Sequence, residues 1–171
     1  MKHIILIGFM GAGKSTMGKL IANKVGCTFI DTDAYIEKKE GRSIQDIFAD
    51  DGEGYFRNAE TEALRELLKS DKQYVLALGG GTPLLEENRA LLKEAETYVV
   101  FLKISAEDAY ERLKDDVTRP LLQGVNIKEE IKSLLLMRNP VYETIADYVL
   151  LEDDKSLDDI FCELSVVIKG V

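Results

Sequence analysis

A buried strand that runs directly into a glycine-rich loop is the feature that most constrains this chain. Four apolar residues at 4–7 are followed by the sequence GFMGAGKST at residues 8–16. Glycines in such a loop let the backbone turn its N–H groups toward a polyphosphate, and a helix that starts near Lys14 adds the positive end of its dipole. Lys14 is then expected to reach the β- and γ-phosphates, and the Ser15 hydroxyl to bind Mg²⁺. The loop therefore predicts a site for a nucleotide polyphosphate.

The segment after the loop has the helical pattern that such a site requires. Met17, Leu20, Ile21 and Val25 recur at the spacing of one helix face. The competing interpretation is a glycine-rich turn without a ligand. The preceding strand, the loop spacing and the following helix all agree with phosphate binding instead.

Length and composition predict one globular domain over residues 1–171. The chain is 46% hydrophobic, which is enough to bury a core without disulfides or metals. No apolar run reaches the roughly 18 residues of a membrane span, and the first strand begins so soon after Met1 that no signal or transit peptide is expected. We therefore expect a soluble, cytoplasmic protein that does not contact a membrane.

Cysteine and histidine chemistry are not expected. Cys27 and Cys162 lie far apart in the sequence and lack metal-ligand spacing, which predicts two reduced, mostly buried thiols. His3 is the only histidine and lies at the start of the first strand. Acid–base catalysis is therefore expected to depend on other residue types.

The net charge of −9 argues against a nucleic acid or an anionic membrane as partner, because either would need a broad basic surface. The loop nevertheless predicts a strongly anionic ligand. Cationic groups must therefore be concentrated at one site of an acidic protein, which makes the position of each arginine informative. The chain has seven arginines, at positions 42, 57, 65, 89, 112, 119 and 138.

Strand-like and helical segments alternate along the chain, which predicts an α/β fold. The expected strands are nearly continuous apolar runs, as in a parallel sheet that helices cover on both faces to give three α/β/α layers. These strands are expected at residues 3–7, 27–31, 74–78, 98–104 and 148–151.

Polar or glycine-rich residues follow the second and third expected strands, where ligands bind in open parallel sheets. Asp31 and Asp33 would point the same way in an extended segment, one to hold Mg²⁺ through water and the other to hydrogen-bond an acceptor hydroxyl. Asp33 also fits as the N-cap of a helix beginning at Ala34, so Asp31 alone is free of that competing explanation. The glycines at 79–81 suit either a closely approaching substrate or a structural turn.

Three arginines are candidate anion-binding groups, and each also has a simpler explanation. Arg57 lies early in a long helical pattern, where it suits a surface ion pair. Arg119 lies in the expected mobile loop at 115–126, from which an arginine can reach a reacting phosphoryl group. Arg138 lies near the expected end of a helix, just before Pro140, and suits interaction with that helix's negative end.

Taken together, these motifs resemble the shikimate kinase family in order and spacing, from residue 4 to about residue 148. The resemblance implies the fold of the nucleoside monophosphate kinases, a five-stranded parallel sheet with strand order 2-3-1-4-5. It also implies a substrate-binding region at about 32–60 and a short lid at about 112–126. The motifs that carry it are GFMGAGKST at 8–16, DTD at 31–33, IQDIF at 44–48, GE at 52–53, FR at 56–57, Glu60, GGG at 79–81, RPLL at 119–122 and RNPVY at 138–142.

The resemblance also implies the activity, which is ATP- and Mg²⁺-dependent phosphorylation of the 3-hydroxyl of shikimate on the route to aromatic amino acids. Ser15 and Asp31 match the positions that bind Mg²⁺, the latter through water. Asp33, Lys14 and Arg119 match catalytic positions. The ATP-binding positions match Gly11, Ala12, Gly13, Lys14, Ser15, Thr16, Arg112 against adenine and Arg119 at the transferring phosphate. The shikimate-binding positions match Asp33, Arg57, Glu60, Gly79, Gly80, Gly81 and Arg138.

One departure and two alternatives remain. Family members often place a proline after the last strand as a wall of the adenine site, whereas this chain has EDDK at 152–155. A related small kinase that phosphorylates gluconate or a nucleoside monophosphate is one alternative, and a nucleotide-dependent regulator without catalysis is the other. ATP and shikimate are the expected binding partners, and a monomer is the expected state.

Overall fold

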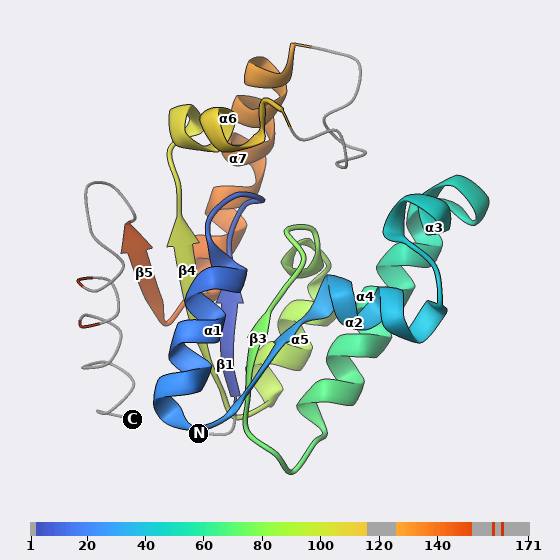
Figure 1. Ribbon diagram of the computed structural model, residues 1–171, viewed down its shortest axis with the longest axis vertical. Helices are drawn as coiled ribbons and strands as arrows, with labels where there is room; N and C mark the ends of the chain where they lie inside the picture. Colours follow the sequence, from blue (N-terminus) through green and yellow to red (C-terminus); the bar gives the residue numbers. More distant parts are fainter. Residues whose placement is uncertain (1–2, 116–125, 152–158, 160–161, 163–171) are drawn as a thin grey trace.

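The computed structural model describes residues 3–115, 126–151, 159 and 162, and it has the predicted α/β architecture (Figure 1). The strands are β1 (His3–Ile7), β2 (Thr28–Asp31), β3 (Tyr74–Ala77), β4 (Thr97–Lys103) and β5 (Tyr148–Leu151). The helices of the described chain are α1 (Lys14–Val25), α2 (Thr32–Glu40), α3 (Ile44–Asp50), α4 (Gly52–Leu68), the 3₁₀ turn η1 (Thr82–Leu84), α5 (Glu86–Glu94), α6 (Ala106–Leu113) and α7 (Ile127–Ile145).

The five strands form one parallel sheet with the order β2-β3-β1-β4-β5, which confirms the predicted fold. The register pairs Leu6 of β1 with Ala77 of β3, and Ala77 with Asp31 of β2. The carboxyl ends of these three strands therefore lie level with one another at the upper edge of the sheet in Figure 1. This alignment brings the segments after the three strands into one region.

The core lies on both faces of the sheet because β1 is buried along its whole length. Side chains of a strand alternate between faces, so Ile4 and Leu6 pack in one hydrophobic cluster while Ile5 and Ile7 pack in another. The first cluster includes residues of α1, α6 and the first half of α7, and the second includes residues of α4 and α5. Each cluster joins one face of the sheet to the helices that cover it, which gives the three layers of the α/β/α fold.

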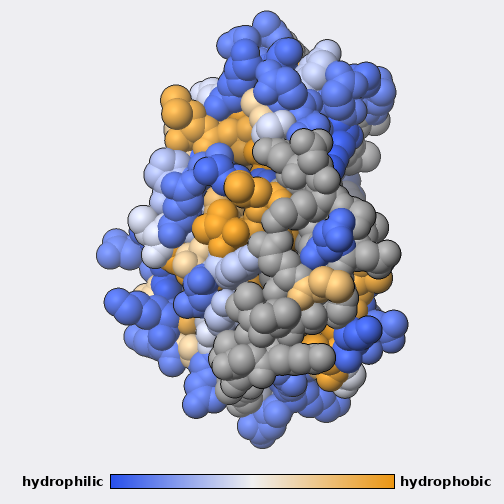
Figure 2. All heavy atoms as spheres, turned by 90° about the vertical axis from the view of Figure 1, so that its left-hand side faces the viewer, coloured by the Kyte–Doolittle hydropathy of each residue, from blue (hydrophilic) through white to orange (hydrophobic). Residues whose placement is uncertain are grey.

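The buried face of α1 differs from the predicted one. Met17 and Ile21 are buried as expected, but Leu20 and Val25 are each 40% exposed. Gly18 is buried instead, because α1 lies so near β2 that a Cβ at Gly18 would come within 2.3 Å of the Phe29 ring. Figure 2 views the side of the molecule on which α1 and β5 lie, and hydrophobic side chains reach the surface near the middle of that view.

Helices α2, α3 and α4 form an arm to the right of the sheet in Figure 1. The arm has its own small core, in which Ile36, Ile47 and Phe56 are buried. A capping box between Ser43 and Asp46 starts α3, since the Ser43 hydroxyl accepts from the Asp46 N–H and the Asp46 side chain accepts from the Ser43 N–H. The predicted substrate-binding region is thus a folded unit beside the sheet.

The sequence predicted that the helix containing Arg138 ends just before Pro140. Helix α7 instead continues through Pro140 to Ile145. Arg138 therefore lies inside the helix, where it is only 4% exposed. The prediction that Arg138 interacts with the negative end of its helix was therefore wrong, because the helix ends seven residues later. The missing N–H of a proline removes one hydrogen bond from the preceding turn, and Leu136 in that turn faces solvent.

The two cysteines are both free thiols, as expected, but they differ in exposure. Cys27 is partly buried, whereas Cys162 is exposed, so the prediction of a mostly buried thiol was wrong for Cys162. Burial raises the pKa of the Cys27 thiol. Within the described residues, no helix is both long and apolar enough to cross a membrane.

Candidate active site

The loop after β1 has the backbone of a phosphate-binding loop. Gly8, Gly11 and Gly13 all have positive φ angles, of 145°, 80° and 72°, which side chains rarely tolerate. A Cβ at Gly8 would also lie 2.5 Å from the Leu102 carbonyl oxygen. The loop leads into α1 at Lys14, and Gly13 has no side chain to cap the first N–H groups of that helix. A helix start without a side-chain cap, preceded by such a loop, is the arrangement that binds a phosphate in proteins.

The Lys14 side chain turns back over the loop. Its Nζ donates to the Gly8 carbonyl at 2.8 Å and to the Phe9 carbonyl at 3.0 Å. The positive charge therefore lies at the loop itself, beside the start of α1. This is the position from which a lysine can reach a phosphate that the loop binds.

Ser15 and Asp31 lie together beside the loop, because the Ser15 hydroxyl donates to Asp31 Oδ2 at 2.7 Å. The described residues contain no group of three or more His, Cys, Asp or Glu side chains that could bind a metal. Magnesium, however, often keeps several waters and takes only one or two protein oxygens beside the substrate phosphates. The hydroxyl and carboxylate of this pair fit that donor set.

Asp31, not Asp33, caps the second helix. Asp31 Oδ1 accepts from the N–H groups of Asp33 and Ala34, at 3.1 and 3.4 Å. The prediction that Asp33 could cap this helix and that Asp31 is free of a capping role was therefore wrong on both points, because α2 begins at Thr32, directly after β2. Asp33 instead lies in the first turn of α2.

Thr32 fixes this junction, although the sequence did not identify it as functional. Its hydroxyl donates to the Ala77 carbonyl at 3.1 Å and accepts from the Gly79 N–H at 3.2 Å, and the residue is buried. Thr32 thus ties the start of α2 to the end of β3. The one sequence feature that could have identified Thr32 is its place between Asp31 and Asp33.

A cavity of about 490 Å³ lies beside the loop, between the sheet edge and the α2–α4 arm. All the predicted shikimate-binding residues line it, at positions 33, 57, 60, 79, 80, 81 and 138. Its remaining walls come from residues that the sequence did not single out for binding, mainly Met10, Ala34, Glu37, Ser43, Ile44, Gln45, Phe48 and Phe56. The cavity therefore combines apolar walls with two arginines and four buried or half-buried acids, at positions 31, 33, 37 and 60.

The triple glycine lets charged side chains approach the backbone, and none of its three residues has a positive φ. A Cβ at Gly79 would lie 2.6 Å from Glu60 Oε1 and 2.7 Å from Asp33 Oδ1. At Gly80 it would lie 3.2 Å from Arg138 Nη1, and at Gly81 only 2.1 Å from Arg57 Nη1. The absence of side chains thus makes room for four charged groups.

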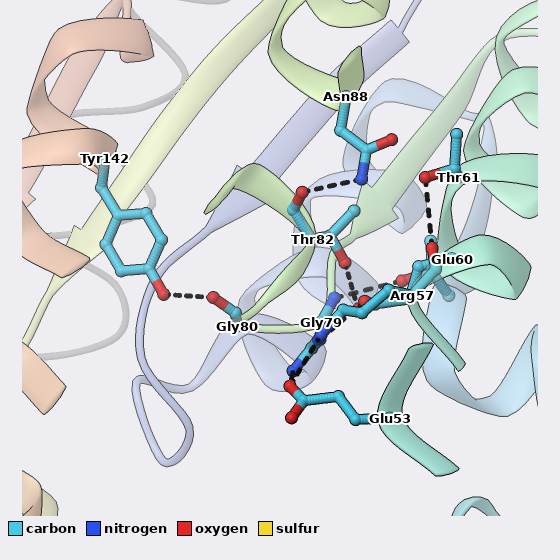
Figure 3. Close-up of polar contacts among 10 residues, drawn as sticks. Glu53, Arg57, Glu60, Thr61, Gly79, Gly80, Thr82, Asn88 and Tyr142 are labelled. Atoms are coloured by element: carbon cyan, nitrogen blue, oxygen red, sulfur yellow. Dashed lines mark hydrogen bonds and ion pairs between the residues drawn. The ribbon is translucent and has the colours of Figure 1, made fainter. Parts of the chain in front are cut away.

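Two carboxylates surround Arg57 (Figure 3). Its Nη1 donates to Glu60 Oε2 at 2.6 Å, while Nε and Nη2 donate to Glu53 Oε1 at 3.1 and 2.8 Å. Burial alone would lower the pKa of Arg57, but the charges and hydrogen bonds of Glu60 and Glu53 outweigh it and the net shift is upward. The side chain is only 17% exposed, so Arg57 is a fixed cation in the cavity and not an ordinary surface ion pair.

Arg138 is a buried cation with unused hydrogen-bonding capacity. Its guanidinium lies over the Phe9 ring at 5.7 Å, and no described residue accepts a hydrogen bond from its Nε. A buried charge of this kind is costly unless an opposite charge compensates it. The position favours an anionic group in the adjoining cavity.

Arg112 lies on the other side of the loop, where its Nη1 donates to the Gly11 carbonyl at 2.7 Å. The described part of the predicted nucleotide site therefore consists of the loop, the start of α1 and Arg112 at the end of α6. Arg119 and the EDDK segment at 152–155 lie outside the described residues.

Comparison with known proteins places these features in one family. The shikimate kinase family model matches residues 10–169. A shikimate kinase from Thermodesulfovibrio yellowstonii is 45% identical over 150 residues, which are 88% of this chain and 85% of that protein. One from Dictyoglomus turgidum is 43% identical over 161 residues, which are 92% of each chain. The structure of Acinetobacter baumannii shikimate kinase in complex with shikimate is similar with a TM-score of 0.91 and 37% identity, over 99% of this chain and 94% of that one.

Proposed function

This chain belongs to the shikimate kinase family, and we propose that it uses ATP and Mg²⁺ to phosphorylate the 3-hydroxyl of shikimate, giving shikimate 3-phosphate on the route to aromatic amino acids. The observation that carries the proposal is the arrangement of Arg57 and Arg138 about adjacent glycines, in a cavity that also contains Asp33 and adjoins the phosphate-binding loop. A hydroxylated acid is the ligand that such a set of groups would bind.

Arg57 and Arg138 bind the carboxylate of shikimate in this proposal. A planar guanidinium matches a carboxylate with two parallel hydrogen bonds, which fix orientation as well as adding energy. Three of the five N–H groups of Arg57 donate to Glu53 and Glu60, which leaves two for a ligand. The carboxylate is remote from the reacting hydroxyl, so binding energy there is used for alignment.

Asp33 positions the acceptor hydroxyl and accepts its proton. Its Oδ1 lies close to the Gly79 backbone, on the cavity side of the first turn of α2. Phosphoryl transfer requires positioning and charge neutralisation more than covalent catalysis by the protein, so orientation of the hydroxyl is the main contribution of Asp33.

The donor side of the site is formed by the loop, Lys14 and the Ser15–Asp31 pair. The loop N–H groups and Lys14 bind the phosphates of ATP, and Arg112 and Arg119 bind the adenine and the transferring phosphate. Ser15 would hold Mg²⁺ directly and Asp31 would hold it through water. When bound, Mg²⁺ would supply positive charge that neutralises the phosphates.

The alternatives of another small kinase or a non-catalytic regulator fit these residues less well. A nucleoside monophosphate would need a pocket for its base, and a regulator that binds ATP alone would need neither Arg57 nor Arg138. The presence of both arginines beside Asp33 in one cavity therefore favours a carboxylic acid as acceptor.

A coupled assay of ADP release tests the proposal. The purified protein is given ATP and Mg²⁺ with shikimate, with gluconate, with a nucleoside monophosphate, or with no acceptor. We expect ADP release that depends on shikimate, with phosphate on the 3-hydroxyl by NMR of the product. Release with another acceptor only, or nucleotide binding without ADP release, would refute the proposal.

We extend the proposal to the organisation of the protein. A single kinase domain over residues 1–171, a monomeric state and a cytoplasmic location all suit a biosynthetic enzyme with small-molecule substrates. Gel filtration with light scattering tests the monomer directly.

A further inference from the structure

Glu60 is a buried acid whose two oxygens have different partners. The residue is 2% exposed, and a carboxylate so deeply buried requires hydrogen-bonding or ionic partners. Oε2 accepts from Arg57 Nη1 at 2.6 Å, and Oε1 accepts from the Thr82 hydroxyl at 2.6 Å (Figure 3). Because one oxygen is fixed by the threonine, the other is directed toward the arginine.

Thr82 is itself held in place by its backbone. It is 1% exposed, its N–H donates to the Gly79 carbonyl at 3.1 Å, and its carbonyl accepts from Asn88 Nδ2 at 2.8 Å. Asn88 is fully buried in α5. Figure 3 shows Asn88, Thr82, Glu60 and Arg57 as a continuous series of contacts from α5 to the cavity.

The second partner of Arg57 provides a weaker restraint. Glu53 is 56% exposed at its side chain, and an ion pair in contact with water contributes little to orientation or stability. Glu60 is 1% exposed at its side chain, so its hydrogen bonds are far less screened. The direction of the Arg57 guanidinium therefore depends mainly on Glu60.

We propose that Thr82 is a positioning residue for the substrate carboxylate, acting through Glu60 on Arg57. The Thr82 hydroxyl sets the plane of the Glu60 carboxylate, and that plane sets which N–H groups of Arg57 face the cavity. The inference rests on the proposed function, because Arg57 binds the shikimate carboxylate there. It adds a residue immediately after the triple glycine to the determinants of acceptor binding.

Thr82→Val tests this role, since valine has nearly the same shape but no hydroxyl. We expect the dissociation constant for shikimate, measured by calorimetry without ATP, and the KM for shikimate to rise about tenfold, as for the loss of a hydrogen bond to a charged group. The KM for ATP and kcat at saturating shikimate should change less than about threefold, because the donor site is untouched. Thr82→Ser keeps the hydroxyl and should restore shikimate binding to within about threefold of the wild type.

Thr61→Val is the matched control. The Thr61 hydroxyl donates to the Arg57 carbonyl at 3.1 Å on the same helix, whereas the hydroxyl that donates to Glu60 is that of Thr82. This variant should leave the KM for shikimate unchanged. A double variant with Glu60→Gln provides a further check: Thr82→Val should have a smaller effect on shikimate binding there than in the wild type, because its partner charge is gone.

Unchanged shikimate binding in folded Thr82→Val, or an equal loss in Thr82→Val and Thr61→Val, would overturn the inference. A uniform fall in kcat with unchanged KM would overturn it as well. If Thr82→Val does not fold, as judged by circular dichroism, Thr82→Ala is measured against the same expectations. Wild-type protein without shikimate-dependent ADP release would instead refute the proposed function, so the two failures are distinguishable.

Discussion

The Tyr142 hydroxyl donates a hydrogen bond to the Gly80 carbonyl at 2.5 Å, and so joins α7 to the glycine turn of the cavity. Tyr142 lies one helical turn after Arg138, and its ring packs against Phe101 with centroids 5.1 Å apart. Burial raises the pKa of Tyr142 to about 12, although the positive charge of Arg138 acts in the opposite direction. The phenol therefore stays protonated in the fold at a pH where a free tyrosine ionises.

This shift predicts a loss of stability at alkaline pH. The contribution of Tyr142 is complete below pH 10, where the phenol is protonated in both states. Between pH 10 and about 12 the unfolded chain releases its proton while the folded chain keeps it, so the free energy of unfolding falls as pH rises. The full loss is about 2–3 kcal/mol for a shift of this size. Urea titrations between pH 8 and pH 11.5 measure it.

Tyr142→Phe is the control for that experiment, because Tyr35, Tyr55 and Tyr98 also have raised pKa values. The variant should be less stable than the wild type at pH 8, since the Gly80 carbonyl loses its donor. The difference between the two proteins should shrink toward pH 11.5. A constant difference would show that Tyr142 titrates normally.

Replacement of Arg138 is expected to weaken acceptor binding. Arg138→Ala removes a charge-assisted contact, so shikimate affinity should fall by roughly 1.5–3 kcal/mol, or about 10- to 150-fold. Calorimetry with shikimate in the absence of ATP measures the change. Arg138→Met keeps more of the buried volume and should give a similar loss. Arg65→Ala, which removes surface ion pairs with Glu62 and Glu87, should bind shikimate normally.

A methyl group at position 81 is expected to displace Arg57. A Cβ there would lie 2.1 Å from Arg57 Nη1, and Glu53 and Glu60 restrict the guanidinium from moving away. Gly81→Ala should raise the KM for shikimate about tenfold or more, as misplacement of a binding group does. Gly54→Ala is the matched control, because a Cβ at Gly54 meets nothing within 4 Å. It should keep normal KM values and gain about 0.5–1 kcal/mol of stability.

Lys14→Ala is expected to abolish measurable turnover without unfolding the protein. The hydrogen bonds from Lys14 Nζ to the Gly8 and Phe9 carbonyls lie within the loop, whereas loss of a charge at a transferring phosphate costs at least about 10²-fold in kcat. Lys19→Ala on the same helix should be fully active. Retained turnover in Lys14→Ala would remove Lys14 from the mechanism.

Asp33→Asn is expected to lower kcat by about 10²-fold or more while ATP binding is retained. The amide keeps the size of the side chain but accepts no proton from the acceptor hydroxyl. ADP release slowed to that extent, with normal nucleotide binding by calorimetry, is the expected pair of results. Asp50→Asn on the exposed face of α3 serves as control, and near-normal turnover in Asp33→Asn would contradict the assignment.

The strands and the sheet type could be predicted because buried parallel strands leave continuous apolar runs. Each strand begins and ends within one residue of its expected bounds. The strand order could not be obtained from periodicity, because neighbours in the sheet are set by contacts distant in sequence, and it came from the family resemblance. The glycines of the loop were equally clear, since positive φ angles leave few other residue types.

The supporting contacts of the site could not be predicted. The start of α2 at Thr32 depends on hydrogen bonds to Ala77, the last residue of β3, and to Gly79, which follows that strand. The same is true of the contact between Thr82 and Glu60, which are separated along the chain by the second half of α4 and by β3. The continuation of α7 through Pro140 depends on packing of the helix against the sheet, which outweighs the local preference of proline.

Asp31 joins the two halves of the site through a single side chain. One of its oxygens caps α2, which carries Asp33, the residue proposed to position the acceptor, and the other accepts from Ser15 at the start of α1. The relative position of the proposed donor and acceptor groups therefore depends on the contacts of one carboxylate. A substitution at this position would alter the alignment of both substrates at once, and no change at one binding surface alone would compensate for it.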